Sequence, residues 1–287
     1  MIDRSCDLCG ESDHTPIVIE NGYPIVRCRC CGFIYVNRIP EIEDGKVLGE
    51  YYSGSPEEIE SSRGPYAKVF EFLLDEIERR ASKGTLLDVG CGYGFFLSAA
   101  RERGWDVFGT ELSDIAIRYA SEELAIGRIV CSDLSPDLFD GHRFDAINLT
   151  NVLEHVPSPT STLMTCREML KPGGIIAIRV PNMVFSAVRH RLLPLARHFK
   201  YGSGGELSYL STHPPIHLSG FSPPSLDRVL RKCGFESVEI KPSKLSDPPS
   251  KIFPYSVFEK AVSVCFGLSA SRINIGPTLL AMARREI

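Results

Sequence analysis

The sequence lacks any apolar run close to the roughly 18 to 20 residues that a helix needs to cross a bilayer. It also lacks the basic and apolar regions of a secretory signal peptide, because it begins Met1-Ile2-Asp3. Both absences predict a cytoplasmic protein. Since disulfides are rare in that compartment, we expect the ten cysteines to bind metal or to remain free thiols.

A strong excess of one charge is also missing, because the net charge is −4. The hydrophobic share of 43% and the charged share of 24% are ordinary for a soluble protein with a sizeable core. From Met183 onward there are 14 Lys and Arg against 7 Asp and Glu. This surplus favours an anionic partner for the C-terminal third, or a solvated surface that the acidic first part balances.

Two cysteine pairs near the N-terminus have the spacing of a zinc site. Each is a Cys-x2-Cys pair followed by a glycine, and 18 residues separate them. Glycine permits the positive φ that closes such a turn. Four thiolates leave no open coordination position, so we expect a structural zinc in a ribbon over residues 1–37, with short strands at 17–19, 25–26 and 33–36. The expected zinc ligands are Cys6, Cys9, Cys28 and Cys31.

The remaining chain predicts a connector and then one α/β domain. Residues 38–64 are polar and rich in Gly, Pro and Ser, and Tyr51-Tyr52 is the only aromatic anchor of a connector that can fold over a pocket. Helical spacing of apolar residues predicts an amphipathic helix over 65–80 that begins at Pro65. The domain itself is expected over 65–287.

Alternating strands and helices predict a Rossmann-like, doubly wound, mostly parallel sheet of seven strands with helices on both faces. The first five strands are expected at 85–89, 106–110, 128–131, 145–149 and 174–180, with helices at 94–103, 114–124 and 159–170. Residues 181–220 interrupt the alternation as a lid-like insertion. After it we expect a helix at 225–233, a strand at 237–240, a helix at 254–266 and a strand at 278–283.

A glycine-rich turn follows the first of these strands. Gly90, Gly92 and Gly94 alternate after Asp88, and this turn allows a ligand to lie against bare backbone. A dinucleotide site would need a third glycine where Phe95 stands. The carboxylate of Asp88 would repel a diphosphate but suits the ammonium and sulfonium charges of S-adenosylmethionine (SAM).

Acidic residues also end the next two strands. Glu111 can accept both ribose hydroxyls of an adenosine, and Asp133 can accept the adenine amino group. Taken singly, Asp133 also suits a helix cap and Glu111 a surface carboxylate.

With these motifs and a Lys171-Pro172-Gly173-Gly174 turn, the chain resembles class I SAM-dependent methyltransferases. It is most similar to the bacterial subfamily with an N-terminal zinc ribbon, the methyltransferase type 11 and 23 group. The resemblance implies SAM as cofactor, bound by Asp88, Gly90, Cys91, Gly92, Tyr93, Glu111, Leu112, Asp133, Leu134 and Asn151.

Glu154, His155 and His217 are the candidate catalytic residues, since an oxygen acceptor must lose its proton. The arrangement is similar to that of ubiquinone-biosynthesis O-methyltransferases and plant small-RNA 2′-O-methyltransferases, in which Glu-x-x-Glu-His and, in the RNA enzymes, a later His bind a divalent metal. Asn151 stands here for the first Glu, and the missing carboxylate disfavours Mg²⁺. As alternatives, Glu154-His155 is a helix-entry element, and His213 and His217 are loop histidines with satisfied hydrogen bonds.

The insertion is basic and amphipathic between Arg189 and Lys200. It suits a phosphate-bearing acceptor, a peripheral membrane contact, or a lid helix with one wet side. Together these features predict an enzyme that methylates a small-molecule or glycan-like acceptor, at oxygen. The alternatives are an RNA methyltransferase, which the net charge and the few basic residues of the ribbon disfavour, and a non-catalytic SAM-binding protein.

Overall fold

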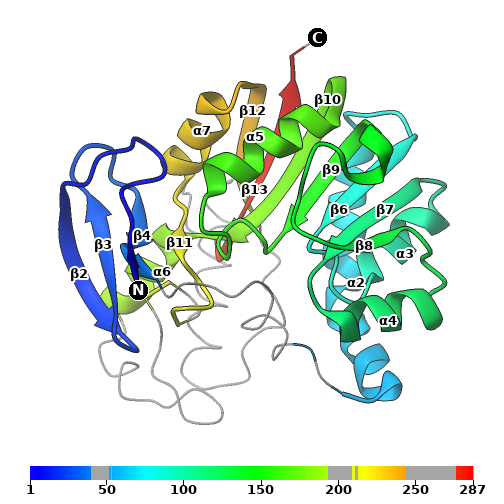
Figure 1. The fold of residues 1–287 in the computed structure, drawn as a ribbon, viewed down its shortest axis with the longest axis horizontal. Helices are drawn as coiled ribbons and strands as arrows, with labels where there is room; N and C mark the ends of the chain where they lie inside the picture. The colour runs from blue at the N-terminus through cyan, green and yellow to red at the C-terminus, as the bar shows by residue number, and fades with distance from the viewer. Residues whose placement is uncertain (40–51, 53, 193–208, 211–212, 244–275, 287) are drawn as a thin grey trace.

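The computed structural model describes residues 1–39, 52, 54–192, 209–210, 213–243 and 276–286 (Figure 1). Its centre is a seven-stranded sheet in the order β12-β13-β10-β9-β6-β7-β8. The strands from β10 to β8 run parallel, and β13 pairs antiparallel with both β10 and β12. The strands are β6 (Thr85–Val89), β7 (Asp106–Glu111), β8 (Ile129–Cys131), β9 (Phe144–Thr150), β10 (Leu170–Pro181), β12 (Phe235–Ser243) and β13 (Thr278–Arg285). The predicted Rossmann-like, mostly parallel sheet of seven strands is confirmed.

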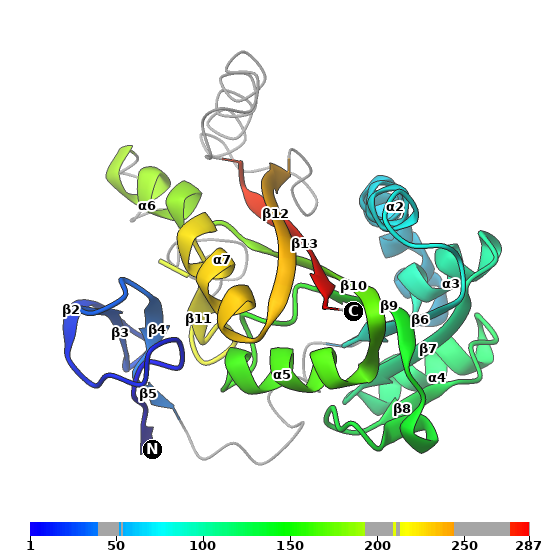
Figure 2. The same cartoon turned by 90° about the horizontal axis from the view of Figure 1, so that it is seen from above.

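Helices pack on both faces of this sheet (Figure 2). One face carries α2 (Pro56–Glu78) and α3 (Phe95–Glu102), and the other carries α5 (Pro159–Met169) and α7 (Pro223–Lys232). The cause is strand alternation: Leu86 of β6 packs with α2 and α3, whereas the next residue, Leu87, packs with α5 and α7. The helix α4 (Asp114–Glu122) contacts β7 and β8, and a short 3-10 helix spans Leu138–Gly141.

The first long helix begins earlier than its apolar spacing predicts. It starts at Pro56 rather than Pro65, so Pro65 lies inside it. Ser55 and Glu58 form a capping box, and Pro56 occupies the first turn, where its missing N–H costs nothing. These local signals outweigh the hydrogen bond that an interior proline removes.

The N-terminal residues form a separate small sheet, which we call the ribbon sheet. Three of its strands come from the ribbon: β2 (His14–Glu20), β3 (Tyr23–Cys28) and β4 (Ile34–Val36). The fourth is β11 (Ser219–Gly220), which pairs antiparallel with β4. Beside it, β1 (Ile2–Asp3) pairs with β5 (Arg38–Ile39). A segment of the larger domain therefore completes the sheet of the ribbon.

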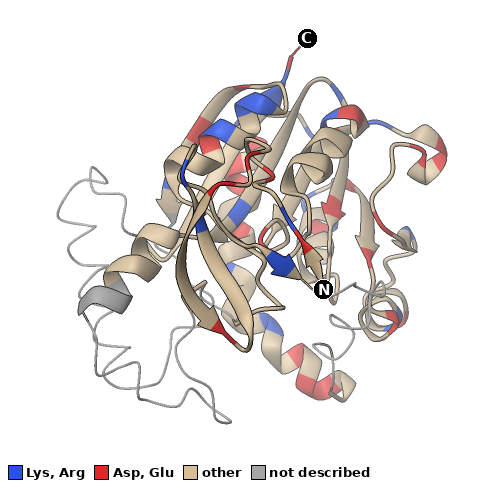
Figure 3. Ribbon diagram, turned by 60° about the vertical axis from the view of Figure 1, so that its left-hand side comes forward, with Lys and Arg blue, Asp and Glu red and all other residues tan. Residues whose placement is uncertain are grey.

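Part of the predicted insertion is visible as α6 (Met183–Leu192). The expected helix at 254–266 and residues 193–208 of the insertion lie outside the described residues, as do the side chains of the basic stretch from Arg189 to Lys200. Figure 3 shows Lys and Arg interspersed with Asp and Glu along the described chain. Among the described helices, none combines the length and apolar character that crossing a membrane requires.

A buried acid joins α2 to the sheet. Glu76 is 2% exposed and accepts hydrogen bonds from Arg80 of the same helix at 2.9 Å and from Lys241 of β12 at 2.6 Å. Burial opposes ionisation of Glu76, but the hydrogen bond and charge of Lys241, with Arg80 and Arg79, outweigh it and lower the pKa below its ordinary value.

Replacing Glu76 with Ala should lower the free energy of unfolding by about 2 kcal/mol, because it removes the charged hydrogen bonds through which the buried acid joins Arg80 and Lys241. Urea unfolding measures the change. Glu71→Ala, an exposed site on the same helix, serves as the control and should shift it by less than about 0.5 kcal/mol. Equal effects of the two substitutions would contradict this account of Glu76.

Candidate functional site

The glycine-rich turn lies at the carboxyl end of β6 and approaches the loop after β9. Gly90 has φ +64° and Gly92 has φ +53°, conformations that favour glycine. A Cβ on Gly90 would stand 2.8 Å from a methyl carbon of Val152. The turn and the loop after β9 can therefore lie this close only because Gly90 has no side chain.

Asp88 is buried just before this turn. It is 3% exposed and accepts a hydrogen bond of 2.7 Å from the amide of Asn148 on β9. Burial raises the pKa of Asp88 to about 7, and the charge of Glu111 adds to this, while the Asn148 hydrogen bond opposes it. Because its pKa is near neutrality, Asp88 would ionise when a positively charged group binds beside it.

Glu111 ends β7 beside the glycine turn. One carboxylate oxygen accepts from the backbone N–H of Gly92 at 2.8 Å, and the other accepts from the N–H groups of Leu112 at 2.8 Å and Ser113 at 3.0 Å. Three backbone donors thus fix the carboxylate. On the neighbouring strand, Asp133 is exposed and follows the end of β8, with Leu134 half-buried after it.

Tyr52 covers this corner from the connector and is absent from the predicted site residues. Its hydroxyl donates to Glu111 at 3.5 Å and lies 3.2 Å from where a Cβ of Gly92 would be. Its ring meets the ring of Tyr93 edge-on at a centroid distance of 5.1 Å. Burial raises the pKa of Tyr52, so the hydroxyl stays protonated and donates. The sequence signal was the aromatic pair Tyr51-Tyr52 in an otherwise polar connector.

Glu154, His155 and His217 come together after β9. Their potential ligand atoms all lie within 4.8 Å of one another, and the two imidazole rings meet edge-on with centroids 4.7 Å apart. Glu154 is 1% exposed and His217 is 6% exposed. The structure thus joins two residues of one loop to a histidine about 60 positions later in the chain.

Both histidines have a fixed tautomer when neutral. Nδ1 of His155 is 2.9 Å from the carbonyl of Ile216, and Nδ1 of His217 is 2.8 Å from the carbonyl of Leu210. A carbonyl only accepts, so each Nδ1 carries the hydrogen and each Nε2 keeps its lone pair. Burial lowers the pKa of His155, and burial together with the charge of His155 lowers the pKa of His217 to about 3. Both rings are therefore neutral at pH 7.

Two other residues of the sequence analysis have identified partners. Nδ1 of His213 lies 3.1 Å from the carboxylate of Glu20 on β2, at hydrogen-bond distance from the ribbon. Asn151 has φ +56°, and its amide oxygen accepts from buried Arg179 at 3.2 Å. His213 is thus a loop histidine with a partner, and Arg179 engages the residue that stands where a first carboxylate would be.

The four N-terminal cysteines converge as their spacing predicts. Their Sγ atoms lie within 4.8 Å of one another, with 3.4 Å between Cys6 and Cys31 and between Cys9 and Cys28. Gly10 and Gly32 follow the pairs with φ of +82° and +75°. Four thiols at this spacing suit a tetrahedral zinc ion.

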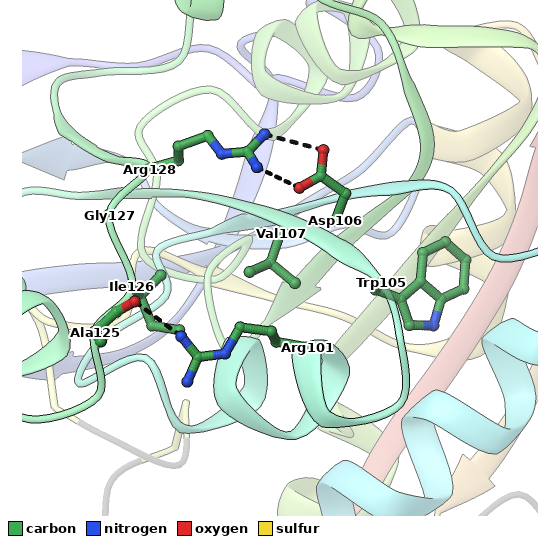
Figure 4. A pocket seen from close by; sticks show the side chains of 8 residues that line it. All are labelled: Arg101, Trp105, Asp106, Val107, Ala125, Ile126, Gly127 and Arg128. Atoms are coloured by element: carbon green, nitrogen blue, oxygen red, sulfur yellow. Dashed lines mark hydrogen bonds and ion pairs between the residues drawn. The ribbon is translucent and has the colours of Figure 1, made fainter.

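A hollow at the start of β7 is not a functional site. Figure 4 shows it lined by Arg101, Asp106 and Arg128, and Arg128 pairs with Asp106 while Arg101 donates to the carbonyl of Ala125. Its volume of about 150 Å³ is below the roughly 300 to 1,000 Å³ of small-molecule sites. It also lies at the amino end of the strand, away from the edge that binds ligands in open α/β sheets.

Residues 62–240 match the family model described as a methyltransferase domain, which is more than half of the chain. The chain belongs to this methyltransferase family. It has the fold of class I SAM-dependent methyltransferases. The chain superposes on one from a Haloferax volcanii complex of the Trm112 methyltransferase activator and a putative methyltransferase, with a TM-score of 0.55 and 19% identity. The match covers 81% of this chain and 93% of that one.

Curated relatives also come from this class of methyltransferases. A ubiquinone biosynthesis O-methyltransferase of Coxiella burnetii is 30% identical over 138 residues, which are 47% of this chain and 59% of that protein. The protein of the same name from Azoarcus sp. is 28% identical over 177 residues, or 60% of this chain and 72% of its own length. This chain thus spans little more than half of the length of the Coxiella relative.

The raised pKa of Asp88 predicts a pH-dependent stability. An unfolded carboxyl ionises near 3.8 and the folded one near 7, so the folded state binds the proton more tightly between these values. Stability should therefore fall as pH rises from about 4 to 7, by up to about 1.4 kcal/mol per pH unit from this group. Asp88→Asn should remove this decline in urea unfolding of the cofactor-free protein. Exposed Asp137→Asn is the control, and a decline that persists in Asp88→Asn would contradict the assignment.

Proposed function

We propose that this protein transfers a methyl group from SAM to an oxygen atom of a small-molecule acceptor. The observation that carries the proposal is the cluster of Glu154, His155 and His217 after β9. β9 pairs with β6, the strand that leads into the glycine turn. The names of the similar O-methyltransferases from Coxiella burnetii and Azoarcus sp. support an oxygen acceptor.

We infer that the cofactor lies along the carboxyl ends of β6, β7 and β8. The methionine part would lie over Gly90 and Gly92, with Asp88 facing its positive charges. Glu111 would accept from the ribose hydroxyls and Asp133 from the adenine amino group. The remaining proposed contacts are those of the predicted set, Cys91, Tyr93, Leu112, Leu134 and Asn151.

The acceptor would be activated by the histidine pair. Methyl transfer from a sulfonium is an in-line displacement, so the protein mainly aligns the two reactants and removes a proton. Nε2 of His155 or His217 holds the lone pair for that proton, and the carboxylate of Glu154 stabilises the imidazolium that forms.

The same three side chains fit a divalent cation. When bound, such an ion would lower the pKa of the acceptor hydroxyl as a Lewis acid. Two imidazoles with one carboxylate suit zinc, manganese or iron better than Mg²⁺, which prefers oxygen ligands. The fixed Nδ1 hydrogen bonds would orient both rings for that role.

We propose that Cys6, Cys9, Cys28 and Cys31 hold a structural zinc ion. We also propose a ribbon over 1–37, a connector over 38–64 and a methyltransferase domain over 65–287, with the first turns of α2 lying in the connector because the helix begins at Pro56. A glycan-like or phosphate-bearing acceptor is the finer proposal, which the basic stretch between Arg189 and Lys200 supports. RNA as acceptor is the second candidate, and filter binding at low salt separates the two.

Isothermal titration with SAM tests the cofactor site. Wild-type protein should bind it, and Glu111→Ala should bind it about 10- to 100-fold more weakly, because hydrogen bonds to a charged acceptor are lost. Exposed Glu122→Ala is the matched control on α4 and should bind normally. No heat with millimolar SAM and folded wild-type protein would refute the proposal.

Turnover tests the histidine pair. Tritiated-methyl SAM with fractionated cell extract identifies the labelled acceptor fraction, and His217→Asn should slow its labelling about 100- to 10,000-fold with SAM affinity unchanged. His142→Asn removes a histidine that stacks on Phe108, away from this loop, and it should label at the wild-type rate. Equal rates in the two variants would exclude His217 from the reaction.

A further inference from the structure

The loop that carries Glu154 and His155 is bound to the ribbon at its far end. Asp7 stands between Cys6 and Cys9, and its carboxylate accepts from Ser158 Oγ at 2.6 Å. It also accepts from the backbone N–H of Thr160 at 2.8 Å and from its hydroxyl at 2.6 Å. Ser158 is the N-cap of α5, so an acid of the cysteine turn binds the first turn of a helix in the methyltransferase domain.

Further contacts hold the same junction. The backbone carbonyl of Asp7 accepts from Thr160 Oγ1 at 3.2 Å and from Lys232 Nζ at 3.1 Å. Arg4 donates to the carbonyls of Pro157 and Val36. The cysteine turn therefore packs on the loop and on α7. Figure 1 shows the ribbon beside α7.

The near end of the loop is bound through β11. The carbonyl of Glu154 accepts from the N–H groups of Leu218 at 2.8 Å and Ser219 at 3.1 Å. The carbonyl of Leu218 in turn accepts from the N–H of Val36 at 2.9 Å, on ribbon strand β4. His217 immediately precedes this segment. The ribbon thus contacts both parts of the candidate acceptor site, the loop with Glu154 and His155 and the segment with His217.

We propose that the ribbon is a positioning element of the acceptor site and that Asp7 is the positioning residue through which the cysteine turn fixes the loop. The inference rests on the proposed function, because it gives that function's acceptor residues their support. A ribbon that served only as an appended module would need none of these bonds to the loop. The cofactor corner at Asp88, Gly90 and Glu111 is built by β6, β7, β9 and the connector, whereas the described hydrogen bonds that support the loop from the ribbon side begin at Glu154. The ribbon should therefore affect acceptor chemistry and leave SAM binding unchanged.

The chemistry requires a carboxylate at this position. Three donors, two hydroxyls and one backbone N–H, converge on two carboxylate oxygens. An Asn side chain offers one oxygen and turns an NH2 group toward one of these donors, which disrupts the junction with almost no change in size. Asp7→Asn is therefore the test substitution. Asp13→Asn makes the same charge change in the ribbon at an exposed residue, whose side chain is 3.7 Å from Arg29.

The experiment uses the full chain purified with zinc and labelled with ¹⁵N-histidine. Long-range ¹H–¹⁵N spectra of the seven imidazoles report the environment of His155 and His217 directly, without an acceptor. Asp7→Asn should move the signals of these two rings and leave zinc content and SAM affinity at the wild-type values. Labelling of the acceptor fraction should show kcat reduced about 10- to 100-fold with KM for SAM unchanged. Asp7→Glu, which keeps the carboxylate, should recover part of the rate.

Thr160→Val provides a second variant on the loop side, which removes one hydroxyl donor to Asp7 and leaves the ribbon unaltered. It should shift the same two imidazoles in the same direction, even if Asp7→Asn lost zinc or failed to fold. Unchanged imidazole signals in Thr160→Val, or Asp7→Asn with only a lower unfolding midpoint, would overturn the proposal. Failure of the proposed function is distinct, because it would appear as wild-type protein that does not bind SAM.

Discussion

The carbonyl of Glu154 is the point on which the two parts of this protein depend. It accepts from two successive N–H groups of Leu218 and Ser219, while Leu218 bonds onward to Val36 of the ribbon. One short segment thus serves as the fourth strand of the ribbon sheet and as the support of the loop after β9. Because backbone groups make these bonds, the link to the ribbon does not use the side chains of Glu154, His155 and His217.

The parallel sheet supplies the second half of the arrangement. Parallel strands end at a common edge, so Asp88, Glu111 and the glycine turn lie at the same side of the sheet. Burial then sets the protonation of the acid and of the histidine, since it raises the pKa of Asp88 to about 7 and lowers that of His217 to about 3. β9 and the loop after it contribute to both places, because Asn148 bonds Asp88 and the same loop carries Glu154 and His155.

Local patterns predict the parts of the fold and the site that depend on neighbours in sequence. The β6 strand, the glycine turn and the cysteine pairs each form within a few residues, and their predicted positions agree with the structure. The predicted start of α2 at Pro65 was wrong, because the capping box at Ser55 is a stronger signal than the apolar spacing.

Contacts between distant segments were beyond sequence patterns. Tyr52 reaches Glu111 across 59 positions, and Asp7 reaches Thr160 across 153. Neither residue lies in a sequence motif that predicts its contact, since an acid in a cysteine turn or a tyrosine in a connector can contact many parts of a protein. The meeting of His155 with His217 follows from no local pattern, and only the resemblance to the small-RNA methyltransferases, in which a later His joins the metal site, implies it.

A crystal structure with bound S-adenosylhomocysteine is the most direct measurement of the central claim. The account predicts the ribose hydroxyls on Glu111, the amino-acid tail over Gly90 and Gly92, and the sulfur atom directed toward the histidine pair. Adenosine bound at another edge of the sheet, or a sulfur atom facing away from His155 and His217, would contradict it.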